Sequence, residues 1–427
     1  YEMALPIHEE CWSMRKAALG ESHPDTLGSM NNLAILYDNQ GEFGKSLLLH
    51  EECLRMRKVV LGESHPDTLM SMNNLASLLF KQGVNLRAFS LFEECSRVFN
   101  IALGDNHPDT LTSMNNLALL HNNIGEYGKA LSLYEECLRM RNIVLGENHP
   151  DALASLNNLA SFYVKQGEYE KALPLHEECL RMRKVVLGEK HPDTLRSLSN
   201  VAILYDSQGK YEMALPIHEE CWSMRKAALG ESHPDTLGSM NNLAILYDNQ
   251  GEFGKSLLLH EECLRMRKVV LGESHPDTLM SMNNLASLLF KQGVNLRAFS
   301  LFEECSRVFN IALGDNHPDT LTSMNNLALL HNNIGEYGKA LSLYEECLRM
   351  RNIVLGENHP DALASLNNLA SFYVKQGEYE KALPLHEECL RMRKVVLGEK
   401  HPDTLRSLSN VAILYDSQGK YEMALPI

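Results

Sequence analysis

Long apolar runs are missing from this 427-residue sequence, and basic residues are fewer than acidic ones. No run approaches the roughly 18–20 apolar residues that a helix needs to span a bilayer, so we expect no membrane insertion. Forty basic residues stand against 55 acidic ones, which gives a formal net charge of −15. Because nucleic acids and many membrane surfaces are anionic, this balance disfavours both as partners.

The sequence also lacks the short motifs that mark catalytic and cofactor sites. Its glycines form no phosphate-binding loop, and no strand-turn nucleophile or isolated carboxylate pair stands out. The 18 histidines recur at fixed positions of a repeat and form no paired metal motif. We therefore expect no enzymatic activity, no cofactor and no metal site.

What the sequence does contain is one repeat with a period of 42 residues. The tripeptide His-Pro-Asp begins at His23, His65, His107, His149, His191, His233, His275, His317, His359 and His401. Residues 1–217 are identical to residues 211–427. The chain therefore reads as a first block over 1–210, an identical second block over 211–420 and the start of a third over 421–427. Such a period predicts a single continuous solenoid over 1–427.

Each repeat has the pattern of two antiparallel helices. Pro24 suits the first turn of a helix, here called helix A, whose apolar residues recur at three- and four-residue steps until Gly41 makes a turn. Helix B is clearest over 169–187, and Gly188 is expected to end it as a left-handed cap. One such hairpin cannot bury its apolar stripe alone, so stability must come from stacking. The expected fold is all-α: a superhelix of ten helix-turn-helix units, uncapped at both ends.

The ten cysteines occupy one position of helix B, which favours buried small residues over a disulfide framework. Cysteines on successive packed helices would be about 8–10 Å apart or more, too far for a disulfide. Free thiols favour a reducing compartment such as the cytoplasm, whereas a filament would fit an extracellular location. The cysteines are Cys11, Cys53, Cys95, Cys137, Cys179, Cys221, Cys263, Cys305, Cys347 and Cys389.

Charged residues on helix B suggest a solvated outer face. Glu51 lies four residues before Arg55, and the same spacing recurs at Glu93 and Arg97. Pairs at this spacing lie on one side of a helix, so we expect each arginine to pair with the glutamate four residues earlier.

These motifs resemble a known family. The succession Asn-Asn-Leu-Ala-x-x-Tyr, Gln-Gly-Glu-Tyr/Phe and Leu-Gly-x-x-His-Pro-Asp-Thr-Leu is similar to the long tetratricopeptide repeats of kinesin light chains and nephrocystin-3-like proteins. The resemblance implies a right-handed superhelix in which helix A lines a concave groove and helix B the convex side. In kinesin light chains the groove holds extended acidic peptides, whose backbone is bound by asparagines of helix A.

By this resemblance, one asparagine of helix A in each repeat is the candidate peptide-binding residue. These are Asn32, Asn74, Asn116, Asn158, Asn200, Asn242, Asn284, Asn326, Asn368 and Asn410. The basic residues that would read an acidic peptide are sparse, with only Lys81, Lys165 and Arg196 at groove positions of the first block. The sequence therefore departs from the family pattern in its charge, and acidic cargo is not expected.

Two functions remain open at this stage. The chain can be a scaffold that binds proteins or peptides in the groove, or a segment of a longer filament built from copies of itself. Tyr1 enters at the start of a helix B and Ile427 stops seven residues into another, at the same phase. Uncapped repeats expose an adhesive stripe, and contacts that do not close on themselves produce helical fibres.

Overall fold

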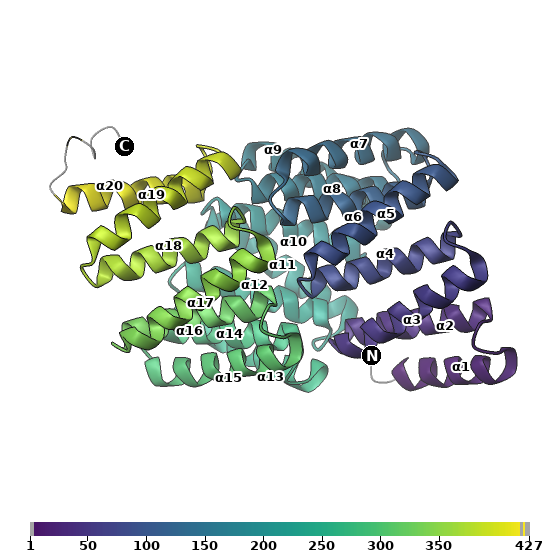
Figure 1. Ribbon diagram of the computed structural model, residues 1–427, viewed down its shortest axis with the longest axis horizontal. Helices are drawn as coiled ribbons and strands as arrows, with labels where there is room; N and C mark the ends of the chain where they lie inside the picture. Colours follow the sequence, from purple (N-terminus) through teal and green to yellow (C-terminus); the bar gives the residue numbers. More distant parts are fainter. Residues whose placement is uncertain (1–3, 419–421, 423–427) are drawn as a thin grey trace. The chain divides into compact units, whose positions relative to one another are not determined.

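The computed structural model describes residues 4–418 and 422, and the described residues form helices joined by short turns (Figure 1). The chain divides into two compact units: residues 1–155 with 274–276, and residues 156–273 with 277–427. The expectation of one continuous domain over 1–427 stays a prediction. Within each unit, helices A and B alternate along the chain as the 42-residue pattern predicts.

Helix A begins at the proline of every His-Pro-Asp motif and is 16 residues long in each repeat. The A helices are α2 (Pro24–Asn39), α4 (Pro66–Lys81), α6 (Pro108–Asn123), α8 (Pro150–Lys165), α10 (Pro192–Ser207), α12 (Pro234–Asn249), α14 (Pro276–Lys291), α16 (Pro318–Asn333), α18 (Pro360–Lys375) and α20 (Pro402–Ser417).

Helix B follows each A–B turn. The B helices are α1 (Ala4–Leu19), α3 (Phe43–Leu61), α5 (Asn85–Leu103), α7 (Tyr127–Leu145), α9 (Tyr169–Leu187), α11 (Tyr211–Leu229), α13 (Phe253–Leu271), α15 (Asn295–Leu313), α17 (Tyr337–Leu355) and α19 (Tyr379–Val396). The expected all-helical repeat of helix-turn-helix units is confirmed.

In nine of the ten repeats the histidine of the His-Pro-Asp motif accepts a hydrogen bond at the start of helix A as its N-cap, a role that the sequence pattern did not reveal. His23 has an extended backbone, and its Nδ1 accepts a hydrogen bond from the backbone N–H of Asp25 at 3.2 Å. Pro24 at the first helical position has no N–H to leave unpaired, and the Asp25 carboxylate lies near the positive end of the helix. The three residues together fix where helix A starts.

Glycines with positive φ shape both kinds of turn. Gly41 has φ +75°, and the N–H of Glu42 behind it donates to the carbonyl of Tyr37 at 2.9 Å, which closes the A–B turn. Gly188 ends α9 with φ 90° and ψ 160°. The expected left-handed cap at Gly188 is therefore wrong in detail, because its ψ is extended; this region is open almost only to glycine.

The apolar core repeats in step with the helices. In the first unit Leu69, Met72 and Leu75 of α4 are buried against Cys95 and Phe99 of α5. Each such leucine contributes about 1.5–3 kcal/mol by leaving water. Nine of the ten cysteines are buried as expected, and Cys11 is half-buried. Burial raises the pKa of the Cys95 thiol to about 12.

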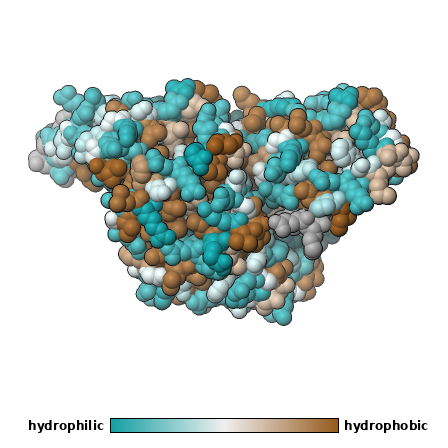
Figure 2. Space-filling view, turned by 90° about the horizontal axis from the view of Figure 1, so that it is seen from below, coloured by the Kyte–Doolittle hydropathy of each residue, from teal (hydrophilic) through white to brown (hydrophobic). Residues whose placement is uncertain are grey.

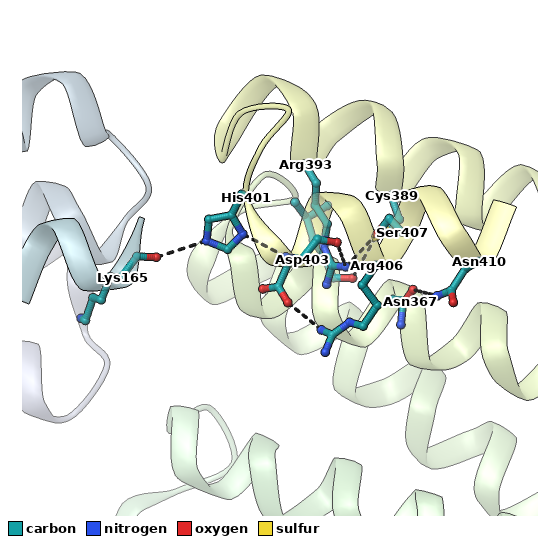
Figure 3. A network of polar contacts seen from close by, with 10 residues as sticks. Lys165, Asn367, Cys389, Arg393, His401, Asp403, Arg406, Ser407 and Asn410 are labelled. Carbon is teal, nitrogen blue, oxygen red and sulfur yellow. Dashed lines mark hydrogen bonds and ion pairs between the residues drawn. The ribbon is translucent and has the colours of Figure 1, made fainter. Parts of the chain in front are cut away.

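A polar cluster ties helix B to the next helix A in every repeat except those of α5 and α15, where Phe99 and Phe309 replace its arginine. Nη1 of Arg57 in α3 donates to the carbonyl of Asp67 at 2.7 Å and to Oγ of Ser71 at 2.9 Å, both in α4. The same serine lies 3.6 Å from Sγ of Cys53. Figure 3 shows the equivalent cluster of Cys389, Arg393 and Ser407. Because a buried guanidinium must be paired, this cluster fixes the register between neighbouring repeats.

We predict that Arg141→Ala lowers the free energy of unfolding by about 2–3 kcal/mol, because it leaves buried acceptors without their donor. Nη1 of Arg141 donates to the carbonyl of Asp151 at 3.0 Å and to Oγ of Ser155 at 2.9 Å. Urea unfolding followed by circular dichroism measures the change.

The matched control is Arg139→Ala, two residues earlier, which removes an exposed ion pair with Glu136. Its effect should stay within about 0.5 kcal/mol. Equal losses from the two variants would contradict a special role for the buried arginine.

Candidate protein-binding surfaces

The ten candidate asparagines lie one on each helix A, so each of the two units carries its own row of them. Asn32 is exposed and the other nine are half-buried. We call this set the helix-A asparagine row.

The amides of this row are tied to the preceding repeat. Nδ2 of Asn74 in α4 donates to Oδ1 of Asn31 in α2 at 3.1 Å, and Asn116 bonds to Asn73 in the same way at 3.2 Å. Five further pairs have the same spacing in the second unit: Asn200 with Asn157, Asn284 with Asn241, Asn326 with Asn283, Asn368 with Asn325, and Asn410 with Asn367. These bonds fix the orientation of each amide that takes part in one.

Within the second unit the pattern of bonds between asparagines is interrupted where the inner asparagine is replaced. Position 199 carries serine instead of the asparagine found at the equivalent Asn157. Among the described residues no hydrogen bond joins Ser199 to Asn242 of the next repeat. We assign the missing hydrogen bond to the side chain of serine, which is shorter than that of asparagine.

Apolar side chains accompany the row on the same helices. Ile35 in α2, Leu119 in α6 and Ile203 in α10 are each more than a third exposed, and Met70 in α4 is 45% exposed. Apolar and polar residues are interspersed over the face shown in Figure 2. The helix-A surface therefore offers amides and aliphatic side chains together.

The basic residues near the row are already paired. Nζ of Lys81 lies 2.6 Å from Oδ2 of Asp38 in the preceding repeat. Arg196 pairs with Asp193 of its own helix at 2.7 Å, and its copy Arg406 pairs with Asp403 at 2.8 Å. Positive charge that is neutralised in this way offers little attraction to an acidic ligand.

On helix B, the expected pairing of each arginine with the glutamate four residues earlier is wrong. Arg55 instead binds Glu52, three residues earlier, through two bonds of 2.8 and 2.6 Å. Glu51 is engaged by Arg87 of the next repeat at 2.7 Å. Tertiary contact with the neighbouring repeat therefore overrides the local pairing.

Four histidines of helix B are buried in the neutral form. Burial lowers the pKa of His50, His176, His260 and His386 to about 4. Folding therefore favours the neutral imidazole, and the unfolded chain binds more protons between about pH 6.5 and pH 4. Stability from these groups is fully present above about pH 6.5 and is lost as the pH falls towards about 4.

We predict that replacing His176 and its copy His386 by phenylalanine reduces the loss of stability between about pH 6.5 and pH 4. Each histidine contributes a slope of up to about 1.4 kcal/mol per pH unit in this window. Phenylalanine is a natural occupant of the position, as at Phe92 in α5, where it is buried. Urea midpoints measured across this range for both proteins give the two slopes, and equal slopes would refute the prediction.

One contact in the second unit joins repeats that are far apart in the sequence. Nε2 of His401 lies 3.2 Å from the carbonyl oxygen of Lys165, while its Nδ1 accepts from the N–H of Asp403 at 3.1 Å (Figure 3). Because the cap uses Nδ1 as acceptor, the ring proton is on Nε2, which donates to Lys165. A Cβ at Gly167 would lie 2.7 Å from Cδ of Pro402, so this turn and the start of α20 fit closely.

No group of three or more His, Cys, Asp or Glu residues suited to a metal ion occurs in the described part of the chain. No helix among residues 4–418 is both long and apolar enough to cross a membrane.

The buried arginines and histidines of helix B were not predicted from the sequence. The available signal was that Arg57, Arg141 and Arg183 recur at one phase, as His50 and His176 do at another. When a polar residue recurs on the side of the helix that faces the core, it is expected to be buried and to have a polar partner on the next repeat.

Repeated helical hairpins with polar ties between neighbouring repeats define a helical-repeat scaffold. Three models of one family, each described as tetratricopeptide repeat, match the chain. The first covers residues 67–143, 151–227, 277–353 and 354–427; the second covers 1–25, 26–67 and 236–277; the third covers 115–183. The chain belongs to the tetratricopeptide repeat family, whose members are generally non-enzymatic and mediate protein–protein interaction.

Two groups of solved structures are similar to the chain. A putative kinesin light chain from Podosopora anserina with nearly identical TPR-like repeats, and a variant of that protein, are 27% identical over 48% of this chain and 97% of theirs, with a TM-score of 0.41. BtubC (BKLC) from P. vanneervenii is 22% identical over 56% of this chain and 92% of its own, with a TM-score of 0.42. No curated protein matches the chain.

Proposed function

We propose that this tetratricopeptide repeat scaffold binds an extended, largely uncharged segment of a partner protein along the helix-A asparagine row. One observation carries the proposal. In the second unit, Nδ2 of Asn284 and Asn326 is engaged by the preceding repeat, whereas their Oδ1 atoms accept no hydrogen bond from any described residue. Each amide thus presents a fixed acceptor to a backbone N–H, whatever the ligand sequence.

The neighbouring side chains support the chemical class of the ligand. Ile35, Leu119 and Ile203 offer apolar surface, whereas the nearby Lys81 is paired with Asp38. A segment with aliphatic side chains and few charges therefore fits better than an acidic one.

The first test replaces the central asparagines of both blocks by alanine: Asn74, Asn116, Asn158, Asn284, Asn326 and Asn368. The probe is a labelled synthetic peptide of alternating leucine and serine, followed by fluorescence anisotropy. Losing three backbone hydrogen bonds per block should weaken binding about tenfold or more.

Two controls separate ligand binding from loss of structure. Asn73→Ala with Asn283→Ala removes the acceptors of Asn116 and Asn326 but keeps the amides of the helix-A asparagine row, so it should weaken binding far less. The same peptide with methylated backbone nitrogens should not bind. An alanine variant with undiminished affinity would move the ligand site away from helix A.

A second candidate function is assembly with copies of the same chain into a longer array. It is favoured by the contact of Lys165 and Gly167 with the start of α20, because every repeat contains the same two elements. A β-carbon added at Gly251, Gly293 or Gly335 would meet no described atom of another segment within 4 Å, so these A–B turns have room for such a contact. Contacts that are repeated without closing produce helical fibres.

Sedimentation velocity and electron microscopy over a range of protein concentrations test this second candidate. Assembly predicts species that lengthen with concentration and show a helical repeat. A monodisperse monomer at every concentration would refute it without affecting the peptide-binding proposal.

A further inference from the structure

Helix α5 and its copy α15 differ from every other helix B at one position that faces the next helix A. At position 96 a serine replaces a large apolar residue, and Ser306 does the same in α15. The other repeats carry Trp12, Leu54, Leu138, Leu180, Trp222, Leu264, Leu348 and Leu390 at this position. Leu54 and Leu264 are buried in core clusters, so the position normally covers part of the core.

The serine leaves the next helix A partly uncovered. Leu117 in α6 and its copy Leu327 in α16 are only half-buried, whereas the equivalent Leu75 and Leu285 are each 2% exposed. Each serine lines an open hollow, of 670 Å³ at Ser96 and 690 Å³ at Ser306. Leu117 and Ile101 form the apolar part of the hollow at Ser96, and Ser90, Glu93, Glu94, Arg97 and Asn100 line the rest of it.

On most other B helices an arginine forms an ion pair with the glutamate three residues earlier, but α5 and α15 lack this ion pair among the described residues. Six equivalent arginines are each bound by the glutamate three residues earlier: Arg55, Arg139, Arg181, Arg265, Arg349 and Arg391. Arg97 and Arg307 make no ion pair with any described residue. Glu94 turns instead to Lys58 of the preceding repeat, at 3.8 Å. An unpaired guanidinium in the lining of the hollow is suited to a carboxylate from a partner.

Two exposed apolar residues extend the surface along α5. Leu86 is 87% exposed and stands where other repeats carry glycine or glutamate, as at Gly44 and Glu170. Ile101, at the other end of the helix, is 73% exposed. Leu86, Ser90, Glu93, Arg97 and Ile101 follow steps of three and four residues, so they lie on one side of the helix. We call this set, with Ser96, the α5 outer face.

We propose that the α5 outer face, and its copy on α15, is a second protein-docking site, distinct from the helix-A asparagine row. It takes a partner helix that places one leucine-sized side chain in the hollow beside Ser96 and a carboxylate against Arg97. The space left by the missing side chain sets the size of the apolar group that fits there. The unpaired arginine favours a negative charge on the residue beside that group. Because the two copies lie in identical blocks, one chain offers two equivalent sites and gains avidity for a partner with two such helices.

The test uses a labelled alanine-based helical peptide that carries one leucine with a glutamate one turn away. Its binding to the full chain is followed by fluorescence anisotropy, and a second peptide with serine in place of the leucine serves as the reference. We expect two peptides per chain, with the serine peptide about tenfold weaker or more. No binding of the leucine peptide, or equal binding of both peptides, overturns the proposal.

Filling the hollow is the decisive variant. Ser96→Leu with Ser306→Leu introduces the residue that Leu138 and Leu348 already provide at this position, so the fold is retained. It should abolish the preference for leucine over serine in the peptide. Arg97→Ala with Arg307→Ala should weaken binding about threefold and remove its salt dependence. The matched control, Arg139→Ala with Arg349→Ala, should leave binding unchanged, because these arginines lie beside a filled position.

The remaining outcomes are equally decisive. Full-strength leucine-dependent binding to the leucine-filled variant would refute the site. If that variant instead changes the sedimentation of the protein alone, the occupant is a second copy of the chain and the assignment to a partner helix is wrong. The asparagine variants should leave this binding unchanged, which separates a failure of this site from a failure of the helix-A proposal.

Discussion

The structure depends on one contact, the arginine by which eight of the ten B helices hold the first turn of the next helix A. Arg183 donates to the carbonyl of Asp193 and to the hydroxyl of Ser197, and its side chain is almost fully buried. Both acceptors belong to the next repeat, so the bond fixes rotation as well as distance between neighbours. The histidine cap acts on the same first turn, because it sets where helix A begins. Together they bring asparagines of neighbouring A helices within hydrogen-bonding distance, as in Asn74 with Asn31.

The same framework tolerates substitutions on the outer side, and these create differences between repeats. In α5 Phe99 takes the place of the arginine and is buried among apolar residues, while Ser96 opens the surface three residues earlier. Since Leu69 and Leu75 still fill the core beneath, the repeat keeps its helices. A regular array can thus carry one irregular surface per block. Because the two blocks are identical in sequence, the same surface occurs again on α15.

Much of this arrangement could be read from particular residues. Pro24 and Gly41 marked the ends of helix A because each has a conformational preference that does not depend on its neighbours. The phase of the cysteines indicated burial, and nine of the ten are buried. The pairing of Arg55 was predicted wrongly, since Glu52 competes for it and the neighbouring Arg87 engages Glu51. The hollow beside Ser96 was missed, because a small residue in place of a large one reveals a cavity only when the facing helix is known.

The sequence by itself determined the helices, their lengths, the turns and the number of repeats. These follow from the conformational preferences of single residues and from the 42-residue period, which recurs along the chain. Tertiary structure decided which polar groups meet across repeats: the arginine with the next first turn, the asparagine with its predecessor, and the glutamate with a neighbouring tyrosine or arginine. The physical reason is that these partners are far apart along the sequence. Such partners lie 10 to 43 residues apart, as in Arg57 with Asp67 and Asn74 with Asn31, and only stacking brings them within hydrogen-bonding range.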